Sequence, residues 1–153
     1  MKVSTMTYTI EKIKATPSAK FIEFAIEVAK ESQLKYKTKY AWGRFDFENY
    51  SKTGCVLACK RNDQYVGLMI FRLGRSIFDS DVRILSQDLL YAKPGTRAAY
   101  YLMKEFIDFG KRNADHIITM IAEHTNIKPK SLEKLGFKKL ETMYRIEVND
   151  GTK

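Results

Sequence analysis

Hydrophobic and polar residues alternate near the start of the chain, over residues 5–11, which predicts a β-strand with one buried face. The apolar residues that follow recur at helical spacing and predict an amphipathic helix, capped by Thr16 and opened by Pro17. Two further apolar runs, residues 55–61 and 65–73, are separated by the turn-forming sequence Asn-Asp-Gln. This pattern predicts a β-hairpin.

Strands and helices alternate in the second half of the chain. The strand, long helix and strand between residues 82 and 122 require a right-handed crossover and therefore parallel pairing. The sequence thus predicts a mixed, mostly antiparallel sheet in a single α/β (α+β) domain, residues 1–148, followed by a polar tail, residues 149–153. The expected elements are a strand over residues 82–91, a helix over 96–114, an apolar strand buried on both faces over 116–122, a short helix over 129–135 stopped by Gly136, and one or two last strands over 138–148.

The composition is that of a globular protein, because 44% of the residues are hydrophobic and 29% are charged, with only 8 Gly and 3 Pro. Disordered, collagen-like and low-complexity chains are excluded. No apolar run approaches the ~18 residues of a membrane-spanning helix, and the N-terminus lacks the apolar stretch of a signal peptide. We therefore expect no membrane association and a cytoplasmic location.

The net charge is +9, from 27 Lys and Arg against 18 Asp and Glu. A basic balance favours an anionic partner such as nucleic acid, an acidic protein or a phosphate-rich cofactor, although it also occurs on enzymes whose lysines only solvate the surface. Residues 35–50 mix basic and aromatic side chains. This segment is compatible with a stacking surface for single-stranded nucleic acid, or with an amphipathic helix whose aromatics belong to the core.

The two cysteines, Cys55 and Cys59, are four residues apart in one predicted strand, so both point to the same face with about 13 Å between them. That distance excludes a disulfide between them. The histidines are His116 and His124, and two cysteines with two histidines so far apart in the sequence make a zinc cluster a poor interpretation. We expect buried, reduced thiols and no metal.

The junction between the predicted strand at 82–91 and the long helix carries the clearest candidate chemistry. Gly95 lies in the turn and small residues begin the helix, so that a ligand can approach the backbone N–H groups. At a helix N-terminus these groups are unpaired and carry the positive end of the helix dipole. With Lys93 and Arg97 they predict a phosphate cradle. The alternative is an ordinary helix start capped by Thr96.

Three features in order along the chain carry a resemblance to a known family. They are the run Leu-Leu-Tyr-Ala-Lys-Pro at residues 89–94, Arg97 three residues later, and Asn126 ahead of Leu-Glu-Lys-Leu-Gly-Phe at 132–137. Together they resemble the GNAT superfamily of N-acetyltransferases, in particular small acetyltransferase-like proteins of phages and bacteria, over residues 82–148. The resemblance implies a central parallel strand pair splayed in a V, about four flanking helices, and an enzyme that uses acetyl-CoA.

The resemblance assigns two stretches of backbone to coenzyme A. Residues 89–92 would hydrogen-bond pantetheine and polarise the thioester carbonyl, and residues 97–102 would bind the pyrophosphate. The chain departs from the family pattern at positions 100 and 102, where bulky side chains replace the usual small ones. The implied cofactor-binding residues are Leu89, Leu90, Tyr91, Ala92, Arg97, Ala98, Ala99, Tyr100, Tyr101, Leu102 and Asn126.

Acetyl transfer needs a base to deprotonate the attacking amine and an acid to reprotonate the leaving thiolate. Asp88 and Glu123 are the candidate bases. The tyrosine that the family often uses as the acid is replaced by Leu132, which leaves Tyr144 or Tyr91 as candidate acids.

Three hypotheses follow. In the first, the chain moves an acetyl group from acetyl-CoA to a primary amine by direct attack, and the basic charge favours an acidic acceptor. In the second, a GNAT-fold protein with changed or lost chemistry binds or modifies nucleic acid. In the third, the chain is a phage- or host-directed binding protein. A dimer is compatible with the sequence, which does not determine the oligomeric state.

Overall fold

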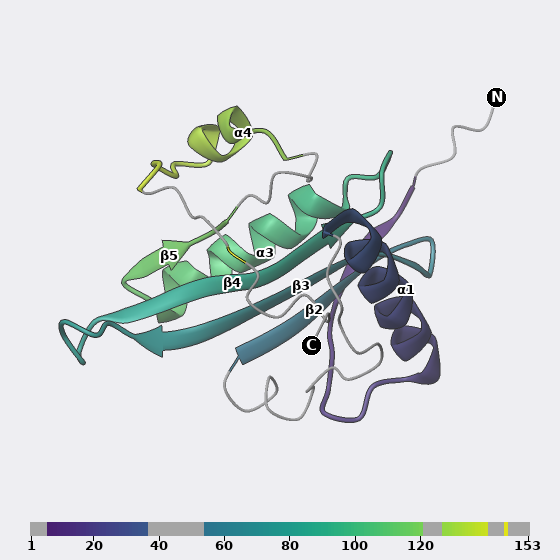
Figure 1. Ribbon diagram of the computed structural model, residues 1–153, viewed down its shortest axis with the longest axis horizontal. Coiled ribbons are helices and arrows are strands. Elements are labelled where there is room, and N and C mark those ends of the chain that lie inside the picture. Colours follow the sequence, from purple (N-terminus) through teal and green to yellow (C-terminus); the bar gives the residue numbers. More distant parts are fainter. Residues whose placement is uncertain (1–5, 37–53, 121–126, 141–145, 147–153) are drawn as a thin grey trace.

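The computed structural model describes residues 6–36, 54–120, 127–140 and 146 of the 153-residue chain (Figure 1). Within these residues, five strands form one sheet in the order β1-β2-β3-β4-β5. The first three pairings are antiparallel, and β4 and β5 pair in parallel. The elements are β1 (Tyr8–Lys12), α1 (Ala19–Tyr36), β2 (Gly54–Arg61), β3 (Gln64–Arg75), β4 (Arg83–Ala92), α3 (Ala98–Asn113), β5 (His116–Ile118) and α4 (Pro129–Lys134).

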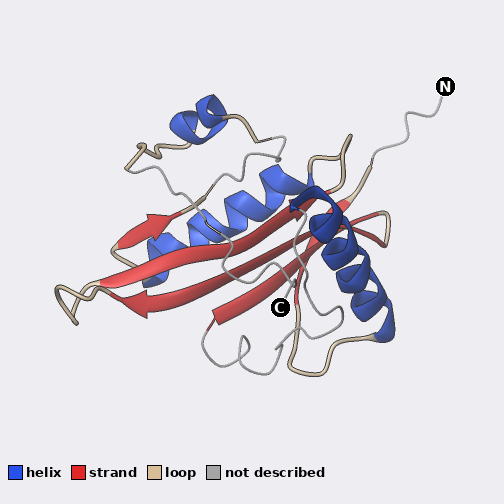
Figure 2. Cartoon of the chain, viewed as in Figure 1, coloured by secondary structure: helices blue, strands red, loops and turns tan. Residues whose placement is uncertain are grey.

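Helices cover both faces of this sheet, which confirms a mixed α+β fold (Figure 2). α1 packs on one face through Phe21, Phe24 and Val28. α3 packs on the other face, where Leu102 and Phe106 are fully buried. Successive residues of β2 and β3 alternate between the two core clusters, as the two-residue period of a strand requires. Each fully buried large apolar side chain contributes about 1.5–3 kcal/mol.

The predicted β-hairpin is confirmed. β2 and β3 are joined by Asn62 and Asp63, whose φ angles are both positive, 51° and 66°. Such a two-residue turn matches the twist of the paired strands, and Asn and Asp tolerate these angles better than other residues with a Cβ. The Asn62 side chain also accepts a hydrogen bond from the Thr7 amide at 3.1 Å, which joins the turn to the strand at the sheet edge.

The start of the first helix differs from the prediction. Thr16 does not cap the helix, because α1 begins at Ala19. The Ser18 hydroxyl accepts a hydrogen bond from the Phe21 amide at 3.2 Å, so Ser18 fills the N-cap position. Ser and Thr are both good caps, and with Ser18 at the N-cap the Phe21 side chain is fully buried on the sheet.

The strand after α3 also differs from the prediction. His116 and Ile118 are exposed and Ile117 is half-buried, so the described part of β5 is not buried on both faces. The reason is that β5 lies at the edge of the described sheet, where only Ile117 faces α3. The short helix is confirmed as α4, and Gly136 follows its end with a φ of 98°. Residues 138–140 are not in a strand, and most of the predicted last strand lies outside the described residues.

Candidate functional site

β4 has two different halves. Its first half pairs on both sides, with β3 through Arg83 to Gln87 and with β5 through Ile84, Leu85 and Ser86. Beyond Ser86, β4 continues to Ala92 along β3, and no described residue pairs with its other edge. Among the described residues, the pairing of β4 with β5 therefore ends at Ser86 and Ile118, which is compatible with a splayed strand pair.

The two halves of β4 meet at a β-bulge. Phe71 of β3 lies opposite Gln87, and Ile70 lies opposite Leu89, so Asp88 is the extra residue. A bulge bends its strand, increases the local twist and reverses the faces to which later side chains point. Leu85 accordingly belongs to the core on the α3 face, whereas Leu89 packs against the cluster on the α1 face.

The backbone of the second half of β4 faces the open edge at alternate residues. The Lys93 amide donates to the Val66 carbonyl at 2.8 Å, so the Lys93 backbone faces β3. Successive residues direct their backbone groups to opposite edges of an antiparallel strand. The N–H and C=O groups of Leu90 and Ala92 therefore face away from β3. Of the expected residues 89–92, these two present backbone groups to the gap.

The start of α3 lies directly after this open edge. Gly95 makes the turn with a φ of 76°, a region that favours glycine. Arg97 rather than Thr96 is the N-cap residue, with no side-chain cap, and the Thr96 hydroxyl is 3.5 Å from the Ala98 amide. The Tyr101 amide is the first to bond back into the helix, at 3.3 Å from the Arg97 carbonyl.

Two amides at this helix start have no protein acceptor within the described part of the chain, those of Ala99 and Tyr100. The amide of Arg97 is different, because it donates to the Tyr8 hydroxyl at 3.1 Å. The predicted cradle thus keeps two unpaired N–H groups at the positive end of the α3 dipole.

Aromatic rings surround the Arg97 guanidinium. Its central carbon lies 5.0 Å from the centroid of the Tyr100 ring and 5.7 Å from that of Tyr101. The Tyr101 ring in turn stacks on Tyr8, with 4.8 Å between centroids. These ring contacts, from β1 and α3, hold the Arg97 cation at the start of α3. Tyr8 belongs to this aromatic cluster but was not predicted from the sequence as a site residue.

The bulky residues of this turn do not fill the cradle. Leu102 is fully buried in the core cluster beneath α3, and Tyr100 is 48% exposed beside Arg97. The close approach of α3 to the sheet depends on Gly67 of β3, because a Cβ there would lie 2.8 Å from the Ala98 Cβ. The small Ala98 and the bulky Leu102 therefore both serve packing, whereas Tyr100 lies outside the core.

Asp88 is held by an arginine from the neighbouring strand. Arg72 donates to both carboxylate oxygens of Asp88, through Nε at 2.6 Å and Nη2 at 3.1 Å. The Asp88 side chain is 23% exposed.

Tyr91 is engaged with α1 rather than with the gap. Its hydroxyl donates to the Glu31 carboxylate at 2.6 Å, and its ring packs edge-on against Phe24. Burial, and then the hydrogen bond and negative charge of Glu31, raise the pKa of the Tyr91 hydroxyl well above its ordinary value. This direction makes Tyr91 a weaker acid than an ordinary tyrosine, which disfavours it as the proton donor.

Several predicted site residues lie outside the described residues. They are Glu123, Asn126 and Tyr144, together with residues 37–50 of the basic and aromatic segment. Leu132, at the position of the usual acid, is buried in the core on the α3 face and serves packing.

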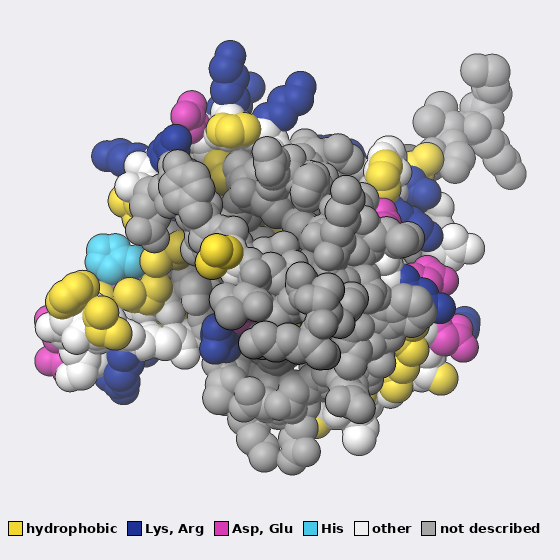
Figure 3. Space-filling view, in the orientation of Figure 1, with side chains coloured by type: hydrophobic (Ala, Val, Ile, Leu, Met, Phe, Trp, Pro, Cys, Tyr) yellow, Lys and Arg dark blue, Asp and Glu magenta, His cyan; other side chains and the backbone are white. Residues whose placement is uncertain are grey.

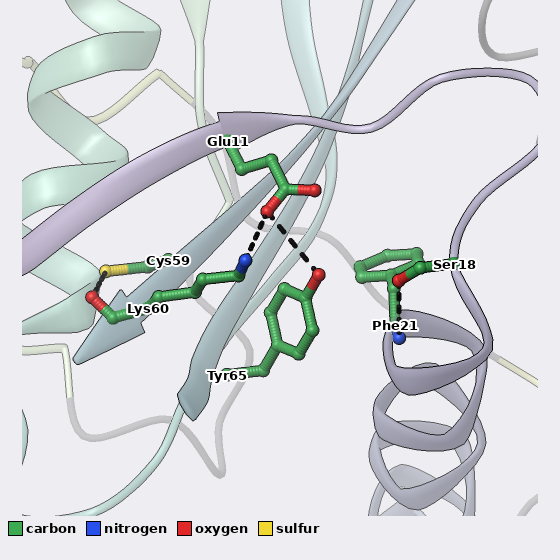
Figure 4. A network of polar contacts seen from close by, with 6 residues as sticks. All are labelled: Glu11, Ser18, Phe21, Cys59, Lys60 and Tyr65. Carbon is green, nitrogen blue, oxygen red and sulfur yellow. Dashed lines mark hydrogen bonds and ion pairs between the residues drawn. The ribbon is translucent and has the colours of Figure 1, made fainter. Parts of the chain in front are cut away.

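A polar network on β1, β2 and β3 lies outside the candidate site (Figure 4). The Glu11 carboxylate accepts from Lys60 Nζ at 2.8 Å and from the Tyr65 hydroxyl at 3.4 Å. The hydrogen bond with Glu11 is the main cause that raises the pKa of Lys60. Tyr65 packs against Phe21 and Phe24, so this network joins the sheet to α1.

Both cysteines are buried and reduced, as predicted. Burial raises the pKa of Cys55 and raises that of Cys59 to about 11. The described residues contain no group of three or more His, Cys, Asp and Glu side chains that could hold a metal ion. Among the same residues, no helix is both long and apolar enough to cross a membrane.

Comparison with known proteins places the fold. No protein-family model matches the chain, and no curated protein matches it significantly. Solved structures do match. A transcriptional regulator from Bacillus halodurans C-125 has a TM-score of 0.72 at 12% identity, covering 92% of this chain and 99% of its own.

Two similar structures are acetyltransferases. An aminoglycoside acetyltransferase from an uncultured soil metagenomic sample has a TM-score of 0.67 at 14% identity, with coverage of 93% and 99%. A ribosomal-protein-alanine N-acetyltransferase from Brucella melitensis biovar Abortus 2308 has a TM-score of 0.67 at 14% identity, with coverage of 92% and 99%. The antiparallel sheet, its parallel β4–β5 pair and these similarities together show that the chain has the GNAT fold.

Proposed function

We propose that this chain is an N-acetyltransferase that moves an acetyl group from acetyl-CoA to a primary amine by direct attack. One observation carries the proposal: the unpaired edge of β4 ends beside the start of α3, where the amides of Ala99 and Tyr100 have no acceptor among the described residues. Several structures that share the fold are acetyltransferases, which supports the same reaction class.

The residues at this junction fit coenzyme A chemically. The amides of Ala99 and Tyr100 would donate to diphosphate oxygens, and the exposed Arg97 guanidinium would neutralise their charge. The outward backbone groups of Leu90 and Ala92 would bond the amide groups of the pantetheine arm, as one strand bonds another. When bound, acetyl-CoA supplies an activated acyl group.

The chain's own residues must move the protons. In direct attack the amine nitrogen bonds to the acyl carbon and the carbon–sulfur bond breaks. One proton leaves the amine, and one reaches the thiolate. We propose Asp88 as the base, because it lies at the bulge where β4 leaves β5 and its carboxylate is held in place by Arg72. Glu123 remains the second candidate base and Tyr144 the candidate acid.

The acceptor is proposed only as a class. The similar enzymes act on an aminoglycoside and on the alanine of a ribosomal protein, and both acceptors present primary amines. The net charge of +9 favours an acceptor with acidic groups near the amine.

The direct test measures thiol release from acetyl-CoA in the presence of a panel of primary amines. The panel contains aminoglycosides, polyamines and peptides with an N-terminal alanine, with and without acidic residues. We expect thiol release that depends on the amine, together with the acetylated product by mass spectrometry. Tight binding of acetyl-CoA without product from any amine would remove the enzymatic proposal and leave a binding protein.

A second candidate function is nucleic-acid binding on the same fold. Exposed lysines gather on and beside α4, and Figure 3 shows basic side chains over this helix. They are Lys128, Lys130, Lys134, Lys138 and Lys139. The test is oligonucleotide binding at several salt concentrations, because phosphate contacts give an affinity that falls steeply with salt. Strong salt-dependent binding without acetyl-CoA binding would favour this function over the first.

A further inference from the structure

One polar side chain, Gln87, is buried in an apolar part of the described structure. It is 6% exposed and lies opposite Phe71, a member of the core cluster beneath α3. Residues directly opposite in a sheet share a face, so the Gln87 carboxamide lies on the α3 side of β4. Such a group is costly to bury unless its hydrogen-bonding atoms find partners.

The oxygen of this carboxamide has a hydrogen-bond partner, whereas the nitrogen has none among the described residues. The Thr119 hydroxyl donates a short hydrogen bond to Gln87 Oε1. Gln87 Nε2 has two N–H groups, and within the described structure neither has an acceptor. Buried amide donors are almost always hydrogen-bonded, so an acceptor from outside the described residues is expected here. The bond to Thr119 fixes the orientation of the carboxamide, and the donor end is therefore preorganised.

Gln87 and Thr119 lie at the closed end of the gap between β4 and β5. The last backbone pair is Ser86 with Ile118. Gln87 follows Ser86 in β4, and Thr119 follows Ile118 directly after the end of β5. Ala92, at the open end, is five residues further along β4, which is about 16 Å of strand. That distance is on the scale of an extended pantetheine arm.

We infer that Gln87 Nε2 donates a hydrogen bond to the carbonyl oxygen at the acyl end of a bound acyl thioester. The inference rests on the proposed function and adds a side chain at the acyl end of the site. A neutral amide donor suits a carbonyl oxygen, and the bond strengthens as negative charge develops on that oxygen during attack. Gln87 thus selects acyl-CoA over free coenzyme A, which lacks this oxygen.

The test compares Gln87→Leu with wild type by calorimetric titration of acetyl-CoA and of coenzyme A. We expect about a tenfold weaker affinity for acetyl-CoA, the scale of one lost hydrogen bond, and an affinity for coenzyme A within about twofold of wild type. Thermal stability should stay equal or rise, because Leu fills the apolar site without unpaired donors. Gln64→Leu, at an exposed position of β3, is the matched control and should change neither affinity.

The outcomes separate the inference from the proposed function. If wild type binds neither ligand, the proposed function fails. If wild type binds both and Gln87→Leu loses neither affinity nor selectivity, the inference alone is overturned. A lower melting temperature with unchanged selectivity assigns Gln87 to the structure and also overturns it. Thr119→Val provides a second variant, because loss of the orienting hydroxyl should reduce selectivity in the same direction by a smaller factor.

Discussion

The two halves of β4 belong to one strand but have different neighbours. From Ile84 to Ser86 the strand is paired on both sides, and Leu85 is fully buried. From Leu89 to Ala92 its only pairing among the described residues is with β3, and its side chains are half-buried. Where the backbone N–H and C=O groups at both edges of β4 are hydrogen-bonded, the strand stabilises the sheet. Where the groups at one edge are not bonded, they are available to a ligand.

The largest expected effect comes from Asp88, at the boundary between the two halves. Asp88→Asn keeps the size of the side chain but removes its capacity to accept a proton. We expect kcat to fall by about 100-fold, while the Kd of acetyl-CoA changes little. Steady-state kinetics and calorimetry together measure this split.

Arg72→Lys is the control for Asp88→Asn, because it keeps a positive charge beside the carboxylate but loses the two-bond geometry. It should lower kcat much less than Asp88→Asn does. Equal kcat in wild type and Asp88→Asn would exclude Asp88 as the base and direct the search to Glu123.

The next largest effect is expected at one of two glycines, Gly67 beside the second half of β4 and Gly110 beside its first half. A Cβ at Gly67 would lie 2.8 Å from the Ala98 Cβ and 2.9 Å from Leu102 Cδ1, which forces the start of α3 away from β3. Gly67→Ala should therefore cost about 1–3 kcal/mol of unfolding free energy and also weaken coenzyme A binding. Denaturant unfolding and calorimetry measure the two consequences.

Gly110→Ala is the comparison for the paired half. Its Cβ would overlap the Ile117 side chain, with Cγ1 at 2.5 Å, and would lie 3.1 Å from Leu85 Cδ2, whereas Ala gains helix propensity of about 1 kcal/mol. We expect a loss of stability comparable with that of Gly67→Ala but no change in coenzyme A affinity. A weaker affinity in Gly110→Ala would show that the paired half also contributes to ligand binding.

The smallest expected effect concerns Cys59 of β2, a strand that is paired on both sides. Burial raises the pKa of Cys59 to about 11 from an ordinary 9.0, so the unfolded thiol ionises first as the pH rises. The folded state keeps its full advantage below pH 9 and loses it as the pH approaches 11. We expect a fall in stability across this window that Cys59→Ala reduces, and no reaction of the native thiols with a thiol reagent at pH 8. Rapid native labelling would mean that the sheet opens here.

The local elements of this fold were predictable from the sequence. The β2–β3 hairpin, α3 and α4 follow from hydrophobic period and turn residues within short stretches of chain. The exact start of a helix is less predictable, since Ser18 caps α1 where the sequence predicted Thr16.

The contacts that shape the candidate site were not predictable in the same way. Arg72 with Asp88 and Gln87 with Thr119 join residues 16 and 32 positions apart, and Tyr8 with Arg97 joins residues 89 apart. No local pattern encodes such pairs. The bulge at Asp88 adds to the difficulty, because it reverses the faces of the residues after it.

The central claim is that the start of α3 binds the diphosphate of coenzyme A, and one calorimetric titration tests it most directly. Coenzyme A is titrated into wild type, Arg97→Glu and Arg112→Glu, since the two variants change the net charge equally at opposite ends of α3. We expect coenzyme A to bind wild type and to bind Arg97→Glu with an affinity at least about tenfold weaker, equivalent to about 1.4 kcal/mol. The affinity of Arg112→Glu should stay near that of wild type. The absence of binding to wild type at millimolar coenzyme A, or equal affinities in all three proteins, would contradict it.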